Sequence, residues 1–245
     1  MSINNSIHNL QWLDPDDPCA PFPPLEHALT DPDGLLAFGG DLSVTRLINA
    51  YRHGIFPWYS DGQPIMWWSP DPRTILLPDN IKISRSLAKT IRKKPYSITL
   101  NNAFADVINA CAAPRNDDEG TWITNEMQHA YNMLHSEGHA HSVEAWQNEE
   151  LVGGLYGIAI GQVFFGESMF AWANDASKIA FVHLVQHLRK AGYKMIDCQV
   201  DSAHLQRLGA TQIPRQLFAK HLDMYCEQAT SSSPFLCQSL TMDEP

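Results

Sequence analysis

The chain lacks any apolar run approaching the roughly 18 residues that a membrane-spanning helix needs. Its first residues, MSINNSIHNLQWLDPDDPC, have neither a basic start nor an apolar core, so they do not resemble a secretory signal. We therefore expect a cytoplasmic protein that is not embedded in a membrane.

Cysteine is scarce and scattered. The five cysteines are odd in number and form no CxxC pair, which argues against a disulfide framework or a cysteine-rich zinc site. Two histidine pairs, His139 with His141 and His183 with His187, could each share one face of an element, but neither has a third ligand nearby. The sequence also has no HExxH motif. We expect no metal site.

Acidic residues outnumber basic residues in the chain. Seventeen Lys and Arg against 27 Asp and Glu give a net charge of −10, which argues against a general nucleic-acid binder. Residues 81–94 are the exception, with six basic and no acidic side chains: Lys82, Arg85, Lys89, Arg92, Lys93 and Lys94. In a helix, Arg85, Lys89 and either Arg92 or Lys93 form one cationic stripe. An ordinary solvated helix face would show the same pattern.

The composition, 44% hydrophobic and 18% charged, is typical of a globular protein, and 245 residues suffice for one domain with a small companion. The first seventy residues are rich in Pro, Gly, Asp and Trp, and contain one predicted helix at 42–54, capped by Ser43 or Thr45 and ended by Gly54. We predict a small, loop-rich N-terminal domain over residues 1–71.

Proline and glycine between residues 57 and 70 should fix the backbone there. That path suits a wall lined by Trp58, Trp67 and Trp68. Core packing is the alternative, and we expect it for at least one of the three.

Strands and helices alternate from about residue 72. The pattern predicts strands at 74–79, 96–100, 141–147, 150–170 and 194–200, and helices at 81–94, 104–113, 124–139 and 176–192, with a further helix starting near 202. Turns are expected at 148–149 and Gly161. This favours an α+β domain over residues 72–245, built on a mixed, mainly antiparallel sheet with one crossover helix.

The last helix–strand–helix resembles the C-terminal half of the N-acetyltransferase superfamily (GNAT) fold. That superfamily holds the pyrophosphate of its acyl donor on a Gly-rich turn that opens a helix. The corresponding stretch here is FAWANDASKIA, which has no glycine. Acetyl-CoA is therefore not the expected donor.

Two carboxylates lie within apolar, strand-like runs: Glu167 in FFGESMF and Asp197 in IDCQV. Burying an ionised carboxylate costs several kcal/mol or more unless partners satisfy it. Strand alternation places Asp197 and Gln199 on one face. Such a pair serves either a structural polar network or chemistry, and the pattern alone fits both.

A series of motifs resembles, in order, those of the leucyl/phenylalanyl-tRNA–protein transferases, and covers most of residues 20–215. The motifs are GGDLS, GIFPW, WWSPDPR, ISRS, EGTWIT, GHAHSVE, LVGGLYG, FFGESMF, ASK and IDCQV. WWSPDPR, GESMF and IDCQ together are the most specific. The resemblance implies an aminoacyltransferase that takes Leu or Phe, with tolerance for Met, from aminoacyl-tRNA. It joins that residue to proteins beginning with Arg or Lys, which marks them for the bacterial N-degron pathway.

The resemblance also implies roles for individual residues. Asp197 resembles the residue that takes a proton from the attacking amine, Gln199 its neighbour that orients the amine, and Glu167 a third member that positions donor or acceptor. Because the tRNA ester is already activated, no cofactor is implied. Glu144 and Glu167 are candidates for recognising the acceptor's Arg or Lys. We expect a monomer.

Binding residues follow from the same resemblance. The donor side-chain pocket is expected to comprise Leu155, Phe164, Met169 and Ile196. Trp58 and Trp122 resemble the residues that stack on the terminal adenosine. The tRNA acceptor-stem phosphates are assigned to the basic residues of 82–94.

Two other interpretations compete with this one. A GNAT-type acyltransferase with a thioester donor would need the missing phosphate loop. A non-catalytic RNA-binding module would use the basic helix and the tryptophans, but it leaves Glu167, Asp197 and Gln199 unexplained. Replacing Asp197 with Ala should lower turnover much more than tRNA affinity if the chain is a transferase.

Overall fold

A computed structural model describes residues 10–114, 121–229, 235 and 238–240. The helices are α1 (Val44–Arg52), α2 (Arg85–Arg92), α3 (Phe104–Ala112), α4 (Asn125–Ser136), α5 (Ala176–Lys190), α6 (Ala203–Arg207) and α7 (Arg215–Tyr225), with 3-10 turns at Leu25–His27 and Pro78–Asn80. The strands are β1 (Gln11–Leu13), β2 (Leu35–Gly39), β3 (Phe56–Pro57), β4 (Met66–Trp68), β5 (Arg73–Leu76), β6 (Ser97–Leu100), β7 (Ala140–Gln147), β8 (Glu150–Ile160), β9 (Val163–Ala171), β10 (Met195–Gln199), β11 (Thr211–Ile213) and β12 (Gln238–Ser239).

These strands form two sheets. The smaller has the order β1-β2-β4-β3, and the larger β11-β5-β10-β9-β8-β7-β6-β12. In the larger sheet β9 and β10 pair in parallel, joined by the crossover helix α5, while the other pairs are antiparallel. The α+β class with a mixed, mainly antiparallel, GNAT-like sheet is therefore confirmed. The division near residue 71 stays a prediction; the small sheet ends at Trp68 and the large one begins at Arg73.

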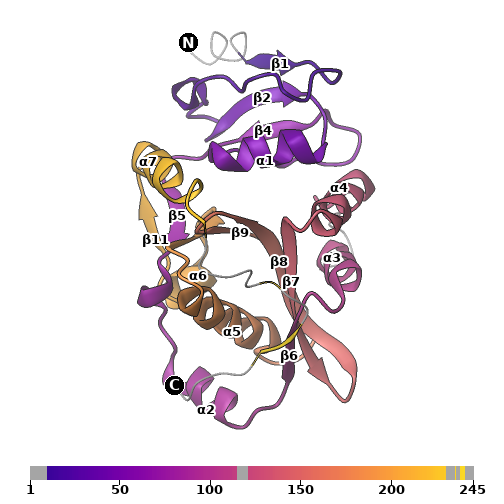
Figure 1. Cartoon of the computed structure of the whole chain (residues 1–245), viewed down its shortest axis with the longest axis vertical. Helices are drawn as coiled ribbons and strands as arrows, with labels where there is room; N and C mark the ends of the chain where they lie inside the picture. The colour runs from indigo at the N-terminus through magenta and orange to yellow at the C-terminus, as the bar shows by residue number, and fades with distance from the viewer. Residues whose placement is uncertain (1–9, 115–120, 230–234, 236–237, 241–245) are drawn as a thin grey trace.

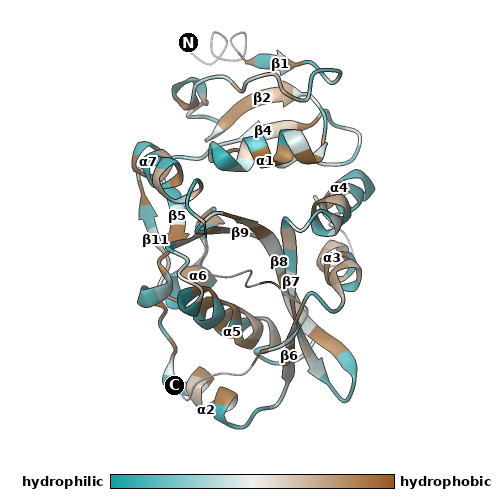
Figure 2. Ribbon diagram, viewed as in Figure 1, coloured by the Kyte–Doolittle hydropathy of each residue, from teal (hydrophilic) through white to brown (hydrophobic). Residues whose placement is uncertain are grey.

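The large sheet carries helices on both faces (Figure 1). Helix α5 packs on one face, where residues of α2 join the same apolar cluster, and α3 and α4 pack on the other. The cluster beneath α3 and α4 continues into the small sheet and α1. Figure 2 shows the central strands mainly apolar and the outer helices α6 and α7 largely hydrophilic. Among the described residues no helix is long and apolar enough to span a membrane.

The predicted helix boundaries hold at the caps. The Ser43 side chain accepts a hydrogen bond from the backbone N–H of Arg46, and Thr124 caps α4 in the same way. Gly54 follows α1 with a φ of 75°, a conformation that glycine adopts without steric strain. The hairpin turn at Asn148 and Glu149 lies where it was predicted.

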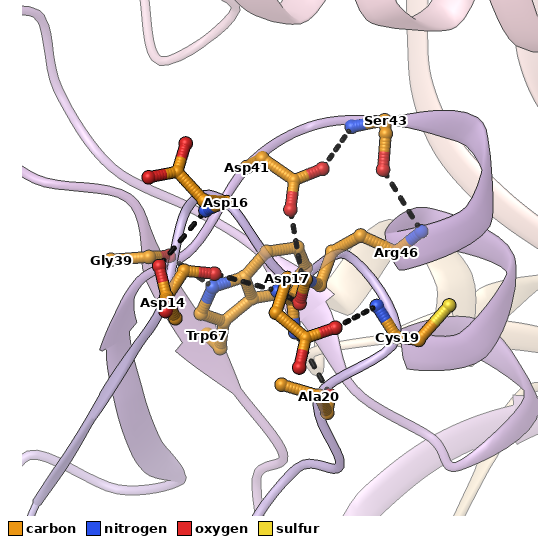
Figure 3. Close-up of polar contacts among 10 residues, drawn as sticks. All are labelled: Asp14, Asp16, Asp17, Cys19, Ala20, Gly39, Asp41, Ser43, Arg46 and Trp67. Atoms are coloured by element: carbon orange, nitrogen blue, oxygen red, sulfur yellow. Dashed lines mark hydrogen bonds and ion pairs between the residues drawn. The ribbon is translucent and has the colours of Figure 1, made fainter.

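Buried Arg46 joins α1 to the segment between β1 and β2 (Figure 3). Its guanidinium donates to the carbonyls of Asp14, Asp17 and Ala20 and pairs with the Asp41 carboxylate at 3.2 Å. A buried guanidinium with five N–H donors needs such partners. Arg46 thus orders a stretch of chain that contains little regular structure.

Trp67 is the tryptophan for which core packing was expected: it is fully buried within the small sheet and donates to the Gly39 carbonyl at 2.8 Å. Two sequence predictions need correction. The strand predicted at 74–79 spans Arg73–Leu76, because Pro78 begins a 3-10 turn. Beyond the last predicted helix the chain adds β11, α7 and β12, short elements without strong periodicity. Residues 119–120 of EGTWIT and Cys237 lie outside the described residues.

Candidate active site

One cavity of about 510 Å³ lies where β9 and β10 diverge. Their parallel pairing ends at Phe165 and Asp197, whereas β9 continues to Ala171. The small sheet contributes Phe56, Pro57 and Trp58 to the wall. All residues predicted for chemistry, donor side chain and adenosine line this cavity: Glu167, Asp197, Gln199, Leu155, Phe164, Met169, Ile196, Trp58 and Trp122.

A β-bulge in β9 sets the direction of the Glu167 side chain. Tyr156 pairs with Ser168 and Gly157 with Gly166, which leaves Glu167 as the extra residue. In a regular strand Glu167 and Met169, two positions apart, would point to the same face. The bulge instead lets Met169 pack on the α5 side while Glu167 reaches side chains of α1 and α4 on the other side.

Glu167 is the centre of a polar cluster. Its Oε1 accepts from the Tyr51 hydroxyl at 2.8 Å and from Gln199 Nε2 at 2.6 Å, and its Oε2 accepts from the Tyr131 hydroxyl at 3.0 Å. Burial raises the pKa of Glu167 to about 7; the phenols oppose the rise and the nearby Asp197 charge adds to it. A carboxyl with this pKa can exchange a proton near neutral pH.

Asp197 forms a buried, two-pronged ion pair with Arg73. Its Oδ1 accepts from Arg73 Nε at 2.8 Å and its Oδ2 from Nη2 at 2.7 Å, and both side chains are fully buried. The guanidinium is held between the rings of Phe56 and Phe218, each centroid 4.8 Å away. Both oxygens of Asp197 are thus engaged, which suits a positioning role better than proton transfer.

Gln199 ends β10 with an irregular backbone, yet it shares the cavity with Asp197, while Ile196 and Cys198 pack in the cluster on the α5 side, as the sequence predicted. The β5–β10 register shifts between Asp197 and Gln199, and Gln199 has a φ of 60°. Such a conformation is uncommon for a residue with a side chain and is found at functional sites. It turns the Gln199 amide to Glu167, while its backbone N–H donates to Asp197 Oδ1 at 3.0 Å.

The predicted donor pocket is apolar. Leu155, Phe164 and Ile196 are buried, Met169 is partly buried, and Phe181 of α5 completes the lining. Gly157 makes room for the Phe164 ring, because a Cβ at position 157 would lie 2.6 Å from that ring.

Aromatic surface is available nearby. Trp58 is 45% exposed and packs at a tilt against Trp68, with centroids 5.7 Å apart, and Trp122 is partly buried. A stacking base needs an accessible ring face of this kind.

Two sets of predicted residues lie elsewhere. Glu144 is fully buried, accepts hydrogen bonds from Thr99, Ser142 and the Ala103 N–H, and does not line the cavity, so it is no candidate for acceptor recognition. The basic side chains of 82–94 are exposed and do not line the cavity either. Their helix α2 lies at the opposite end of the large sheet from the small sheet (Figure 1).

Sequence reasoning missed three residues of the site. Arg73 closes the WWSPDPR motif, so the motif marked its importance but not its partner. Tyr51 and Tyr131 lie on α1 and α4, far apart in the chain, and each resembles an ordinary buried aromatic. Within the described residues no three His, Cys, Asp or Glu side chains gather in a way that could hold a metal ion.

Known proteins resemble this chain over most of its length. Residues 75–223 match the family described as leucyl/phenylalanyl-tRNA protein transferase, and residues 40–71 match that family's N-terminal domain. The leucyl/phenylalanyl-tRNA–protein transferase of Pseudomonas syringae pv. syringae is 58% identical over 223 residues, 91% of this chain and 96% of that protein. The protein of the same name from Pseudomonas aeruginosa PAO1 is 59% identical over 219 residues, 89% and 96% of the two chains.

Among solved structures, L-PGS from Bacillus licheniformis has a TM-score of 0.39 and 12% identity over 66% of this chain and 55% of that one, a likeness too distant to carry an argument. The family matches and the identities to the Pseudomonas proteins are sufficient to assign the family. The chain belongs to the leucyl/phenylalanyl-tRNA–protein transferase family.

Proposed function

We propose that this aminoacyltransferase moves Leu or Phe, and also Met, from its tRNA ester to the N-terminal Arg or Lys of acceptor proteins. The product would carry a new N-terminal residue that directs it to N-degron degradation. The observation that carries the proposal is one cavity that joins an apolar pocket, the exposed Trp58, the partly buried Trp122 and the Glu167–Gln199–Asp197 cluster.

The cavity suggests how both substrates are placed. The donor side chain enters the apolar pocket on the α5 side, and the terminal adenosine stacks on Trp58 and Trp122. The acceptor would reach Glu167 through the cavity, where this carboxylate faces the acceptor's α-ammonium and the Tyr51 and Tyr131 hydroxyls hold it from the buried side. Much of the rate enhancement would then come from holding amine and ester together.

The reaction is an aminolysis. The acceptor's α-amine attacks the ester carbonyl carbon, a C–N bond forms, and the C–O bond to the ribose breaks. Asp197 would act by locking Arg73 and the Gln199 backbone, so that the Gln199 side chain orients the amine. The tRNA acceptor stem would lie along the exposed basic face of α2.

The thioester alternative is disfavoured by the start of α5. In a GNAT-type enzyme this helix start would bind pyrophosphate through free backbone N–H groups. Here the residue before the helix is Asp175, and its carboxylate pairs with Lys178 at 2.5 Å. The stretch FAWANDASKIA also lacks the Gly-rich turn that would expose those N–H groups.

The test uses purified protein, tRNA carrying labelled Leu, and two peptides that differ only in beginning with Arg or with Glu, without ATP or CoA. Label on the Arg peptide alone is the expected result. Label on neither peptide, with tRNA binding intact, would contradict the proposal and favour a non-catalytic RNA-binding module. Label on both peptides would contradict the acceptor rule only.

A further inference from the structure

Tyr51, Tyr131 and Glu167 make three mutual contacts. Tyr51 contacts Glu167 Oε1 at 2.8 Å, Tyr131 contacts Oε2 at 3.0 Å, and the two hydroxyls also contact each other. Each phenol supplies one hydrogen, and an ionised carboxylate supplies none. Two hydrogens would then have to serve three contacts. A protonated Glu167 adds the third hydrogen, and every contact in the ring becomes a hydrogen bond.

The surrounding groups do not supply a cation to Glu167. Within the described residues the ion pairs are Arg46–Asp41, Arg73–Asp197 and Lys178–Asp175, so Arg73 is committed to Asp197. Gln199 donates to Oε1 but brings no charge. When Glu167 is ionised, its negative charge therefore has no cationic partner among the described residues.

A third phenol, Tyr156 of β8, also faces this cluster. It is fully buried, lines the cavity, and its hydroxyl has no hydrogen-bond partner among the described residues. Burial and then the Glu167 charge raise the pKa of Tyr51, Tyr131 and Tyr156 well above the ordinary value, so all three remain phenols. The carboxyl is thus the member of the cluster that changes charge near neutral pH.

We propose that Glu167, Tyr51 and Tyr131 form a proton-holding ring, in which Glu167 takes the proton that the acceptor's α-ammonium must lose before it attacks. Tyr51 and Tyr131 are positioning residues that complete the ring once the proton arrives. This inference rests on the proposed function for the source of the proton, but the ring itself does not depend on it.

The protons balance through the reaction. The ammonium gives one proton to the Glu167 carboxylate and becomes a neutral amine. The amine forms the C–N bond, its nitrogen gives a second proton to the ribose oxygen as the C–O bond breaks, and the ribose leaves as an alcohol. Glu167 then releases its proton to solvent. An α-amine has an ordinary pKa of roughly 7.7–8, close to the pKa of about 7 that burial gives Glu167, so the first transfer costs little.

The ring is tested without substrates by infrared spectroscopy of the free enzyme. The spectrum of wild type minus Glu167→Gln isolates the carboxyl stretch, and we expect the protonated band to titrate with a midpoint near 7, the pKa of Glu167. Tyr51→Phe and Tyr131→Phe should each raise that midpoint by about half a pH unit or more. Each phenol donates a charge-assisted hydrogen bond to the ionised carboxylate, and losing that stronger bond outweighs losing the neutral ring.

Tyr59→Phe is the matched control. Its hydroxyl bonds to Thr124 and Glu126 and does not line the cavity, so the midpoint should not move. A wild-type midpoint in the ordinary range of glutamate, or one that neither ring variant shifts, would overturn the ring.

The proton's source is tested by the pH profile of kcat/KM with an Arg-initiated peptide. The acid limb should follow the infrared midpoint and move with it in Tyr51→Phe and Tyr131→Phe. In Glu167→Gln the acid limb should instead follow the pKa of the acceptor's free α-amine. If the midpoint of the acid limb stayed unchanged in Tyr51→Phe and Tyr131→Phe, the inference would be overturned and the proposed function would remain intact. Failure of the wild type to transfer any label would remove the proposed function, and the infrared titration would still report on the ring.

Discussion

Arg73 and Asp197 neutralise each other inside the protein, so substituting either one alters charge balance as well as chemistry. Asp197→Ala would leave a fully buried guanidinium without its partner. We expect it to lower the free energy of unfolding by about 3–5 kcal/mol, the usual effect of breaking a buried ion pair. Urea denaturation of both proteins measures this.

The double variant Arg73→Met with Asp197→Leu is the control, because removing both charges leaves neither uncompensated. It should unfold near the wild-type urea concentration. If Asp197→Ala alone were as stable as wild type, the pair would not be holding this part of the fold. Asp197→Asn is therefore the better variant for kinetics, with reduced turnover and unchanged tRNA affinity as the expected result.

Leu155 lines the apolar part of the cavity that we propose as the donor pocket, where it is 3% exposed. Leu155→Ala should raise the preference for Phe over Leu, measured as a ratio of kcat/KM values in competition, by about tenfold, because apolar pockets discriminate by only ~1–3 kcal/mol. Ile158→Ala, on the same strand but outside the cavity lining, tests for general destabilisation. Equal ratios in both variants would argue against a pocket at Leu155.

At the scale of elements, two irregular strands assemble the site. The bulge in β9 puts Glu167 on the opposite side of the sheet from Met169, and the shift in β10 turns Gln199 to Glu167. Regular strands would place these side chains by simple alternation. Bulges near active sites commonly re-aim side chains in this way.

Helix α2 buries Leu87 and Ile91 and leaves its basic side chains exposed. We expect Lys89→Glu with Arg92→Glu to weaken binding of every aminoacyl-tRNA alike and to reduce the salt dependence of binding, because phosphate contacts carry no sequence information. Binding titrations at several salt concentrations measure both effects.

The matched control is Arg52→Glu with Lys220→Glu. It makes the same charge change on α1 and α7, at the other end of the molecule from α2 (Figure 1). It should leave binding nearly unchanged. Aminoacyl-adenosine, which lacks the tRNA stem, should react equally well with wild type and with the α2 variant. If the α2 variant lost activity equally with this small donor, its substitutions would be acting on the cavity and not on tRNA binding.

At the scale of the whole molecule, the cavity exists because the small sheet covers the point where the large sheet opens. Tyr51 reaches Glu167 from α1, and Arg73 packs between rings of β3 and α7. Folding therefore places a carboxyl where water cannot fully solvate it. That strain should appear in the stability of the entire protein.

Glu167 has a pKa of about 7 in the folded state against an ordinary value of 4.5, so the folded state binds more protons between these values. Stability should therefore fall as pH rises through this window, by roughly 3 kcal/mol in total. The expected result is that wild type loses this amount relative to Glu167→Gln between about pH 4.5 and about pH 8, as measured by urea unfolding.

The comparison with Glu167→Gln is necessary because His141 acts with the opposite sign. Burial lowers the pKa of His141 from 6.5 to about 3, so its contribution to stability is lost as pH falls below the ordinary value. His141 is present in both proteins, and the difference cancels it. A pH-independent difference would mean that Glu167 titrates alike in the folded and unfolded states.

The sequence by itself determined the fold class, most helix boundaries and the family. Helix periodicity and capping residues such as Ser43 and Thr124 act locally, so they can be recognised in one chain. Nine of the residues that line the cavity were also predictable, because the motifs that contain them resemble the family's.

Tertiary structure alone decided how these residues work together. Asp197 is paired with Arg73 and Gln199 with Glu167, and the two phenols reach Glu167 from helices far apart in sequence. Strand pairing creates the bulges, and long-range packing sets the burial that raises the pKa of Glu167. Both depend on contacts between distant segments, and no local pattern of residues encodes such contacts.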